Sequence, residues 1–499
     1  MVSIHYDTGD PYRIYGINHF IQKYGIQINF NTGSKINIIY GNSSEDTSGF
    51  NIQIIENEMQ KGISGCLKTD TEEILLFENP IRLNKDKETL AMFVDNEGNG
   101  YPGVVLENNG IKIGFDIFNE VGHILSGYLE SFWKLSGNKQ LAKIPVVDYY
   151  EKILFDCIEF ASKKSNNQLK YKPFWSDGKK FAVCLTHDVD RVKKTFQYVT
   201  HTIRHVKKGE IGLAFTKVLP LLRRENPYWN FEKVMEIERK LDVKSTFFFL
   251  NERRRTYLLS PSEWKLYWGR YNIKDVKIVE TMKRLDREGW EIGIHGSYNS
   301  YRDLKRLEEE KKLLEELLGK KVYGISQHYC NLDIPETWEY HEKLGLAYDS
   351  TTGFVTDIGF RWGTCHPFHP FNPAEGKTLS VWEMPIIIMD NACAYKNWKE
   401  IMDIVDIVEK HNGLLLLRWH QGIFNEREFP GQANIYRKII EVCKEKDAWI
   451  TNAYNIVEWL TMREKDDGKI PNLNIIKSQV NPNYQIPMLR RRGYAKRRN

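Results

Sequence analysis

Two carboxylates separated by one residue are the first feature of the chain that could do chemistry. The run THDVD (186–190) places Asp188 and Asp190 directly after the apolar stretch FAVCLT (181–186). Carboxylates this close repel each other unless a cation or a proton lies between them, or unless they do different work. The run therefore predicts a divalent-metal site or a base beside a metal ligand. The alternative is that both cap a following helix, with Arg191 and the two lysines after it neutralising them.

Two histidines follow other apolar runs in the same way. His295 ends WEIGIH (290–295), and Asn299 comes four residues later. An imidazole with an oxygen donor suits zinc or a similar divalent ion, although a lone histidine can equally be structural. His420 follows GLLLLRW (413–419), where its imidazole could serve as a general acid.

The elements that must position these residues alternate between apolar runs and amphipathic segments. Continuous apolar strands between helices indicate a parallel sheet that helices cover on the outside. Seven or eight such units favour an irregular β/α barrel, in which polar residues at the strand ends meet at one edge. We expect the helix near 304–318 to begin with Ser300 as its N-cap and to end at Gly319. The expected strands are 181–186, 245–250, 290–295, 322–327, 379–388 and 413–419.

The length of 499 residues predicts more than one domain. Short β-rich runs split by turn residues predict a smaller α+β domain over 1–140, with a helix at 114–137. A helical connector and linker (141–180), the barrel (181–462) and a basic tail (463–499) would follow.

The composition predicts a soluble protein of the cytoplasm. The 71 basic and 66 acidic residues give a net charge of +5, which is too balanced for a nucleic-acid binder. No run of 18 apolar residues and no secretory leader are visible, and the seven cysteines are scattered and odd in number.

Three further features each allow two interpretations. The block RWGTCHPFHPFN (361–372) could form a sugar subsite through Arg361, Trp362 and His366, or it could be a packing loop fixed by its prolines. The basic stretch 191–240 could lie on an anionic membrane surface or be a solvated helical excursion. Glu383 and Asp390 flank a strand end, where a carboxylate pair would suit a glycosidase.

Together these strand ends resemble the polysaccharide deacetylase family, carbohydrate esterase family 4, also called the NodB-homology domain. The resemblance covers about residues 181–460. THDVD is similar to the family's first motif, and STFFFL (245–250) to its second strand. GWEIGIHGSYN (289–299) is similar to the histidine motif, with His295 at the first metal histidine, and SQHY (326–329) to the third motif. His420 falls on the histidine of the last motif.

The resemblance implies metal-dependent removal of an acyl group from an N- or O-acetylated sugar, during polysaccharide synthesis or modification. The cofactor would be a divalent metal, zinc by analogy, and the sugar could be lipid-linked at the inner face of a membrane. The implied base is Asp188, the acid is His420, and the backbone amide of Tyr329 would stabilise the oxyanion. The implied metal ligands are Asp190, His295 and Asn299, and the candidate substrate-binding residues are Arg361, Trp362, His366, His328 and Glu383.

Three positions depart from the family pattern. Asn299 stands at the second metal histidine, Ser326 at an arginine that usually pairs with the base, and Asp190 at a glycine, so that base and ligand could be exchanged. His187, His328 and Asp349 are candidates for a compensating ligand. The alternative function is an inactive deacetylase-like barrel that binds a glycan or a protein partner.

Overall fold

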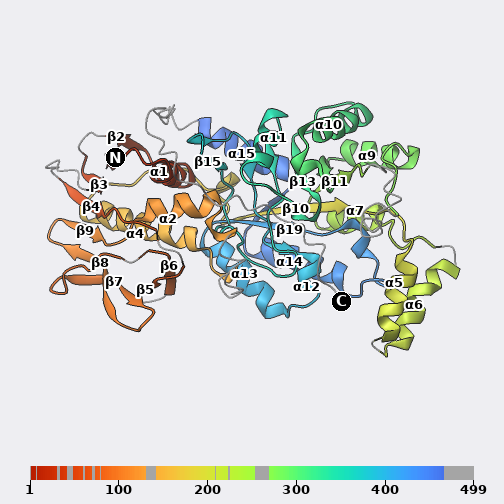
Figure 1. The fold of residues 1–499 in the computed structure, drawn as a ribbon, viewed down its shortest axis with the longest axis horizontal. Helices are drawn as coiled ribbons and strands as arrows, with labels where there is room; N and C mark the ends of the chain where they lie inside the picture. Colours follow the sequence, from red (N-terminus) through yellow and green to blue (C-terminus); the bar gives the residue numbers. More distant parts are fainter. Residues whose placement is uncertain are drawn as a thin grey trace. The chain divides into compact units, whose positions relative to one another are not determined.

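The computed structural model describes residues 2–6, 8–30, 34–41, 49–59, 62–69, 73–78, 80–130, 142–207, 209–222, 225–252 and 269–465 (Figure 1). These residues form two compact units. The first consists of 2–178, 360–379 and 460–465, and the second of 179–359 and 380–459. Residues 360–379, which we expected inside the barrel, therefore belong to the first unit. The expected tail lies outside the described residues from 466 onward.

The first unit is built on one mixed sheet, as the β-rich runs predict. Its parallel half runs in the order β2 (Ile28–Phe30), β1 (Val2–His5), β3 (Ile36–Tyr40), β4 (Phe50–Ile54) and β9 (Gly110–Ile113). The antiparallel half continues with β8 (Gly100–Glu107), β7 (Glu88–Asp95), β5 (Gly65–Lys68) and β6 (Glu73–Leu76).

Helices α1 (Pro11–Tyr24), α2 (Ile117–His123) and α4 (Val146–Lys164) belong to the same unit. α1 begins where the carboxylate of Asp10 accepts hydrogen bonds from the first free backbone amides, and it ends at Gly25 in a left-handed conformation. The helix expected at 114–137 is α2 continued by a π-helical turn, η1 (Ile124–Tyr128), because Gly127 adopts a φ of 106° and breaks the α pattern. Residues 131–137 of that expected helix lie outside the described part of the chain.

The second unit is built on a curled parallel sheet. Its strands run in the order β17 (Trp382–Glu383), β14 (Tyr348–Asp349), β13 (Gly324–Gln327), β12 (Glu291–Gly296), β11 (Thr246–Leu250), β10 (Ala182–Val189), β19 (Leu414–Arg418) and β18 (Ile388–Met389). β20 (Trp449–Thr451) also pairs with β10. The connecting helices are α5 (Gln197–Lys207), α6 (Ile211–Leu222), α7 (Phe231–Lys240), α9 (Val276–Arg287), α10 (Leu304–Leu318), α11 (Glu336–Lys343), α13 (Trp398–Lys410) and α14 (Gln432–Glu445).

One stretch of chain, 382–389, reaches both edges of this sheet. The amide of Met384 donates to the carbonyl of Asp349 beside β14, and the amide of Ile387 donates to the carbonyl of Leu416 in β19. The same chain therefore contacts the two strands that would otherwise be edges, and the expected irregular β/α barrel is confirmed as a curled sheet closed by an irregular segment.

Two local expectations are corrected. The N-cap of α10 is Asp303, whose carboxylate accepts from the amide of Arg306, whereas the hydroxyl of Ser300 hydrogen-bonds to Ser297 and Gln327. Asp188 and Asp190 cap no helix, because the first helix after them, α5, begins at Gln197. Gly319 ends α10 with a φ of 82°, as expected. No helix among the described residues is both long and apolar enough to cross a membrane.

Candidate metal centre and active site

The carboxyl ends of β10 and β12 bring Asp188, Asp190 and His295 together. Asp188 lies within β10, Asp190 is the first residue after that strand, and His295 lies near the end of β12. The Nε2 atom of His295 is 3.2 Å from Oδ1 of Asp190 and 3.8 Å from Oδ2 of Asp188. The predicted association of these three residues therefore exists in the structure.

The tautomer of His295 follows from its neighbour on β13. Its Nδ1 atom lies 2.7 Å from the carbonyl oxygen of Ser326, and a carbonyl only accepts, so Nδ1 carries the proton. In the neutral ring Nε2 then presents a lone pair to two carboxylates. Such a group of electron-pair donors requires a shared proton or a cation, and the distances are close to the ligand separation of about 3.3 Å around a tetrahedral zinc.

His328, rather than Asn299, completes the group. Its Nδ1 atom is 3.7 Å from Oδ1 of Asp190, and its ring stacks on that of His295 with centroids 5.0 Å apart. Asp190, His295 and His328 present ligand atoms that lie within 4.8 Å of one another. Asn299 is exposed in the turn after β12, whereas His328 is buried beside His295.

The two other candidates for a compensating ligand have different partners. His187 points to the opposite face of β10, where it contacts Glu238 at 2.8 Å and the carbonyl of Trp419 at 2.8 Å. Asp349 accepts from the hydroxyl of Thr351 and lies 3.3 Å from Nδ1 of His341.

Arg270, which no motif in the sequence marks, lies against this group. Its guanidinium is 3.5 Å from Oδ2 of Asp190 and donates to the backbone carbonyl of the same residue at 2.9 Å. Burial acts to raise the pKa of Asp190, but Arg270 together with His328, His295 and His420 outweighs burial and holds that pKa well below its usual range. Asp190 is therefore an anion at neutral pH, as a metal ligand must be.

Arg270 also fixes the proton on His328. Its Nη2 atom lies 2.9 Å from Nε2 of His328, and a guanidinium only donates, so Nε2 accepts and Nδ1 carries the proton. Ligation of a metal through Nδ1 would require the opposite tautomer, whose Nε2–H would face another donor. The contact between Arg270 and His328 and the ligation of a metal by Nδ1 therefore exclude each other.

A second cation, Arg418, stands beside Asp188. Its Nε atom is 3.5 Å from Oδ2 of Asp188, and its Nη2 atom donates to the carbonyl and hydroxyl of Ser350. Arg418 ends β19, the strand that neighbours β10 in the sheet. Among the described residues, the other oxygen of Asp188 is buried without a hydrogen-bond partner, which leaves it available to a water or a cation. Arg418 thus takes the place of the charge partner that Ser326 cannot provide.

His420 forms a pair with Asp390. The amide of His420 donates to Oδ2 of Asp390 at 2.6 Å, and its Nδ1 atom lies 2.9 Å from the same oxygen. Burial acts to lower the pKa of His420, but Asp390, with smaller contributions from Asp190 and Asp188, raises it to about 10. His420 therefore carries a proton that it can give away at neutral pH.

Tyr329 lies beside this centre in a backbone conformation that is rare for an aromatic residue. Its φ is 59°, and its side chain is 52% exposed. Its ring lies 4.4 Å from that of His328 and 5.6 Å from that of Tyr298, measured between centroids, with the two tyrosines edge to face. The half-buried ring of Tyr298 and the exposed ring of Tyr329 form an aromatic surface next to this group.

The remaining substrate-binding candidates have interaction partners of their own. Glu383 is fully buried and accepts hydrogen bonds from Trp338 and Thr352, so its oxygens are already occupied by internal donors. Arg361, Trp362 and His366 belong to the first unit, where Arg361 pairs with Glu130 and the ring of His366 stacks on Trp175. The substrate-binding role of these four residues stays a prediction.

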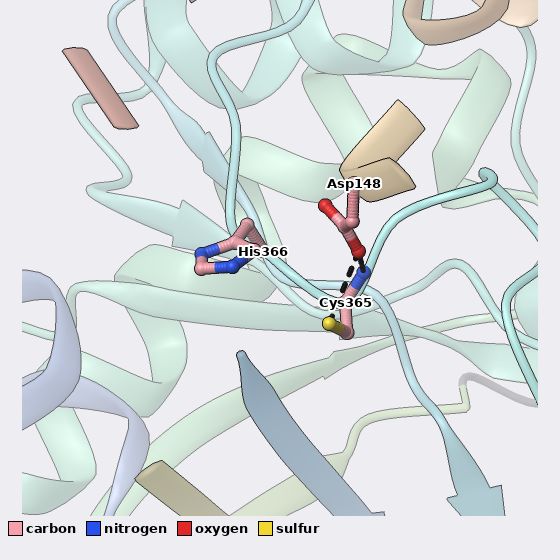
Figure 2. A group of neighbouring side chains, drawn as sticks. All are labelled: Asp148, Cys365 and His366. Atoms are coloured by element: carbon pink, nitrogen blue, oxygen red, sulfur yellow. Dashed lines mark hydrogen bonds between the residues drawn. The ribbon is translucent and has the colours of Figure 1, made fainter. Parts of the chain in front are cut away.

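A second group of possible ligands, Asp148, Cys365 and His366, lies in the first unit (Figure 2). Both oxygens of Asp148 have donors: Lys23 and the hydroxyl of Thr364 on Oδ1, and the amide and thiol of Cys365 on Oδ2. Burial and Asp148 raise the pKa of the Cys365 thiol well above its usual range. The ammonium of Lys23 is already a cation beside Asp148. We therefore interpret this group as a contact that holds residues 360–379 against α4, and not as a metal site.

The chain is similar to several solved structures. No family model and no curated protein matches the chain. Among solved structures, a protein from Mycobacterium smegmatis assigned to the polysaccharide deacetylases is 19% identical, with a TM-score of 0.37 over 58% of this chain and 93% of that one. An allantoinase is 14% identical, with a TM-score of 0.38 over 58% and 93% of the two chains.

Other neighbours are a CE4 family pseudoenzyme from Bacillus anthracis, 13% identical with a TM-score of 0.30 over 56% of this chain and 66% of that one, and further polysaccharide deacetylases. The chain is thus similar in structure to polysaccharide deacetylases, the family that its strand-end motifs resemble.

Proposed function

We propose that this protein is a metal-dependent hydrolase that removes an acetyl group from an N- or O-acetylated sugar in a polysaccharide or its precursor. The observation that carries the proposal is the convergence of Asp188, Asp190 and His295 at one edge of a parallel sheet. Asp188 and Asp190 contribute to the raised pKa of His420. The protonated His420 would thus be the acid that accompanies the proposed base.

The residues that would hold a divalent cation are Asp190, His295 and either His328 or Asp188. Such a cation would supply Lewis-acid polarisation of the acyl carbonyl and of the attacking water. The fit rests on the lone pair of His295 facing two carboxylates and on the unpartnered oxygen of Asp188 among the described residues. The cation would also require Arg270 to release His328 if that ring is the third ligand.

The protein's own side chains would carry out both proton transfers of this reaction. Asp188, held by Arg418, accepts a proton from water as the water oxygen forms a bond to the acyl carbon. The bond from that carbon to the sugar nitrogen or oxygen then breaks, and His420 gives its proton to the leaving amine or hydroxyl. The backbone amide of Tyr329 would donate to the oxyanion, and the rings of Tyr298 and Tyr329 offer a face for a sugar.

A specific observation favours a second function, an inactive barrel that binds a glycan. Arg270 already places a cation against Asp190 and fixes His328 in the tautomer that cannot ligate through Nδ1. In this function the aromatic surface of Tyr298 and Tyr329 would remain in use, and the acid and base would not.

The test measures metal content and acetate release together. Protein purified without chelator should hold about one divalent ion per chain, and it should release acetate from an N-acetylated or O-acetylated oligosaccharide. Asp190→Ala and His295→Ala should abolish both properties. If neither variant changes metal content or hydrolysis, the proposal is wrong. A metal-free protein that binds the oligosaccharide, with binding lost in Tyr329→Ala, would establish the second function instead.

A further inference from the structure

The chain between β10 and α7 forms a helical hairpin with an unusual surface. Helices α5 and α6 pack against each other in this excursion (Figure 1). Seventeen large apolar side chains of the described residues are exposed, and six of them lie within these two helices. Single exposed apolar residues are ordinary, but a concentration on one short hairpin marks an interaction surface. The six are Val199, Ile203, Val206, Ile211, Phe215 and Leu221.

The spacing of these residues places them along helix faces. Val199, Ile203 and Val206 follow the i, i+4, i+7 pattern on α5, and Ile211 and Phe215 follow i, i+4 on α6. That pattern normally turns an apolar stripe toward the core. Here Val199 is 61% exposed and Phe215 is 62% exposed. The core-facing side of the hairpin is instead formed by residues such as Ala214 and Lys217, which are buried.

The hairpin is also the most basic part of the sequence outside the terminal tail. Residues 191–224 contain nine lysines and arginines and one acidic residue, Glu210, in a chain whose total net charge is +5. Lys194 and Lys217 are buried and contact Glu428. The sequence of the excursion is thus strongly basic, and among its described residues Lys193 and Lys207 are exposed.

We propose that the α5–α6 hairpin docks this protein onto an anionic membrane surface, with Val199, Ile203 and Phe215 among the headgroups and acyl-chain ends. A helix that combines an exposed apolar face with Lys and Arg fits the interface of an anionic bilayer, where burial and charge attraction add. A second copy of the chain would cover the apolar stripe, but it would bring two positive surfaces together. A nucleic acid would satisfy the charge and leave the apolar residues exposed.

Flotation with vesicles tests the proposal. The full-length protein should float with vesicles of phosphatidylglycerol and phosphatidylcholine in equal parts, and weakly or not at all with pure phosphatidylcholine. The triple variant Val199→Ser, Ile203→Ser, Phe215→Ser should partition about tenfold less, since each loses apolar area that the bilayer would bury. Salt at about 0.5 M should weaken binding of the wild-type protein, because it screens the charges.

A matched control distinguishes vesicle binding by the hairpin from non-specific binding by other exposed apolar residues. Val276 is 71% exposed and Tyr395 is 86% exposed on other parts of the same unit. The double variant Val276→Ser, Tyr395→Ser should bind vesicles as the wild-type protein does, and circular dichroism should show all variants folded.

Three outcomes would overturn the proposal: no binding to anionic vesicles, equal binding by the triple variant, or a concentration-dependent dimer in sedimentation that only the triple variant loses. Binding of a nucleic acid by the hairpin without vesicle binding would do the same. None of these outcomes depends on whether the barrel hydrolyses a sugar.

Discussion

The cation beside Asp188 comes from a different strand than the family pattern predicts. The sequence has Ser326 where a charge partner for the base is expected, and Arg418 supplies that charge from β19. A buried carboxylate without a cation loses both its charge stabilisation and its orientation.

We expect Arg418→Met to lower kcat by about a hundredfold with little change in KM, because Arg418 is buried and would act through Asp188. Arg418→Lys should recover part of the rate, since it keeps the charge and loses the planar fork. Steady-state kinetics on both variants, with thermal unfolding as the control for folding, distinguishes positioning from general damage. A rise in KM alone would contradict the assignment.

Arg270 leads to the opposite expectation for metal binding. Its guanidinium lies against Asp190 and His328, so its charge repels a divalent cation and its contact holds His328 in the tautomer that cannot ligate through Nδ1. Arg270→Gln should therefore bind Zn²⁺ or Co²⁺ about tenfold more tightly, since a nearby positive charge is removed. Titration of the metal-free protein by calorimetry measures this. A fall in affinity would show that Arg270 orders the ligands instead of opposing the metal.

The acid has a testable pH dependence. The pKa of His420 is raised to about 10, so its protonated form is present below that pH and is lost as pH rises through it. If His420 is the acid, kcat/KM should fall on the alkaline side near that value. Asp390→Asn removes the charge that raises the pKa and should move the alkaline limb to lower pH. An alkaline limb that stays in place in Asp390→Asn would exclude His420 as its origin.

At the scale of elements, the position of a residue relative to the end of its strand decides whether its side chain lies beside His295. β12 ends at Gly296, and the chain then turns through residues 297–303, which leaves Asn299 exposed. β13 ends at Gln327, so His328 leaves the sheet directly beside His295. The donor next to a strand end is held by the sheet, whereas one in a following turn is placed by the turn.

His328→Ala should therefore weaken metal binding by about tenfold or more, if the ring joins the coordination sphere. Asn299→Ala should leave the affinity within about twofold of the wild-type value. Both variants are compared by metal titration of chelator-treated protein. A loss of affinity in Asn299→Ala with none in His328→Ala would restore the ligand set that the family resemblance implies.

At the scale of the whole molecule, residues 360–379 fold with the N-terminal unit although they lie between strands of the barrel. A buried ionic network holds them there. Lys23 on α1 contacts both Asp148 and Glu151 on α4 at 2.8 Å, and Asp148 in turn receives Thr364 and Cys365.

Lys23→Met should destabilise the first unit by about 3–5 kcal/mol, because it removes the ammonium from two buried carboxylates, of which Glu151 keeps only His19 as a basic partner among the described residues. The matched control is Lys152→Met, whose exposed partner Asp156 on the same helix makes the change worth about 0.5 kcal/mol or less. Urea unfolding and limited proteolysis of residues 360–379 measure the two variants. Equal stability of both would show that the network does not fasten the segment.

The sequence by itself determined the parallel β/α architecture of the second unit and the residues at its strand ends, because apolar runs and turn chemistry act locally. It also placed Asp188, Asp190, His295 and His420 correctly at those ends. The tertiary structure decided which residues these side chains contact. Their partners Arg270, Arg418 and Asp390 come from segments far apart in the chain, and no local sequence pattern identifies a lone arginine as a neighbour of a distant carboxylate. It also placed the block 361–372 in the first unit, since the contacts of Thr364 with Asp148 and of Arg361 with Glu130 exist only in the folded chain.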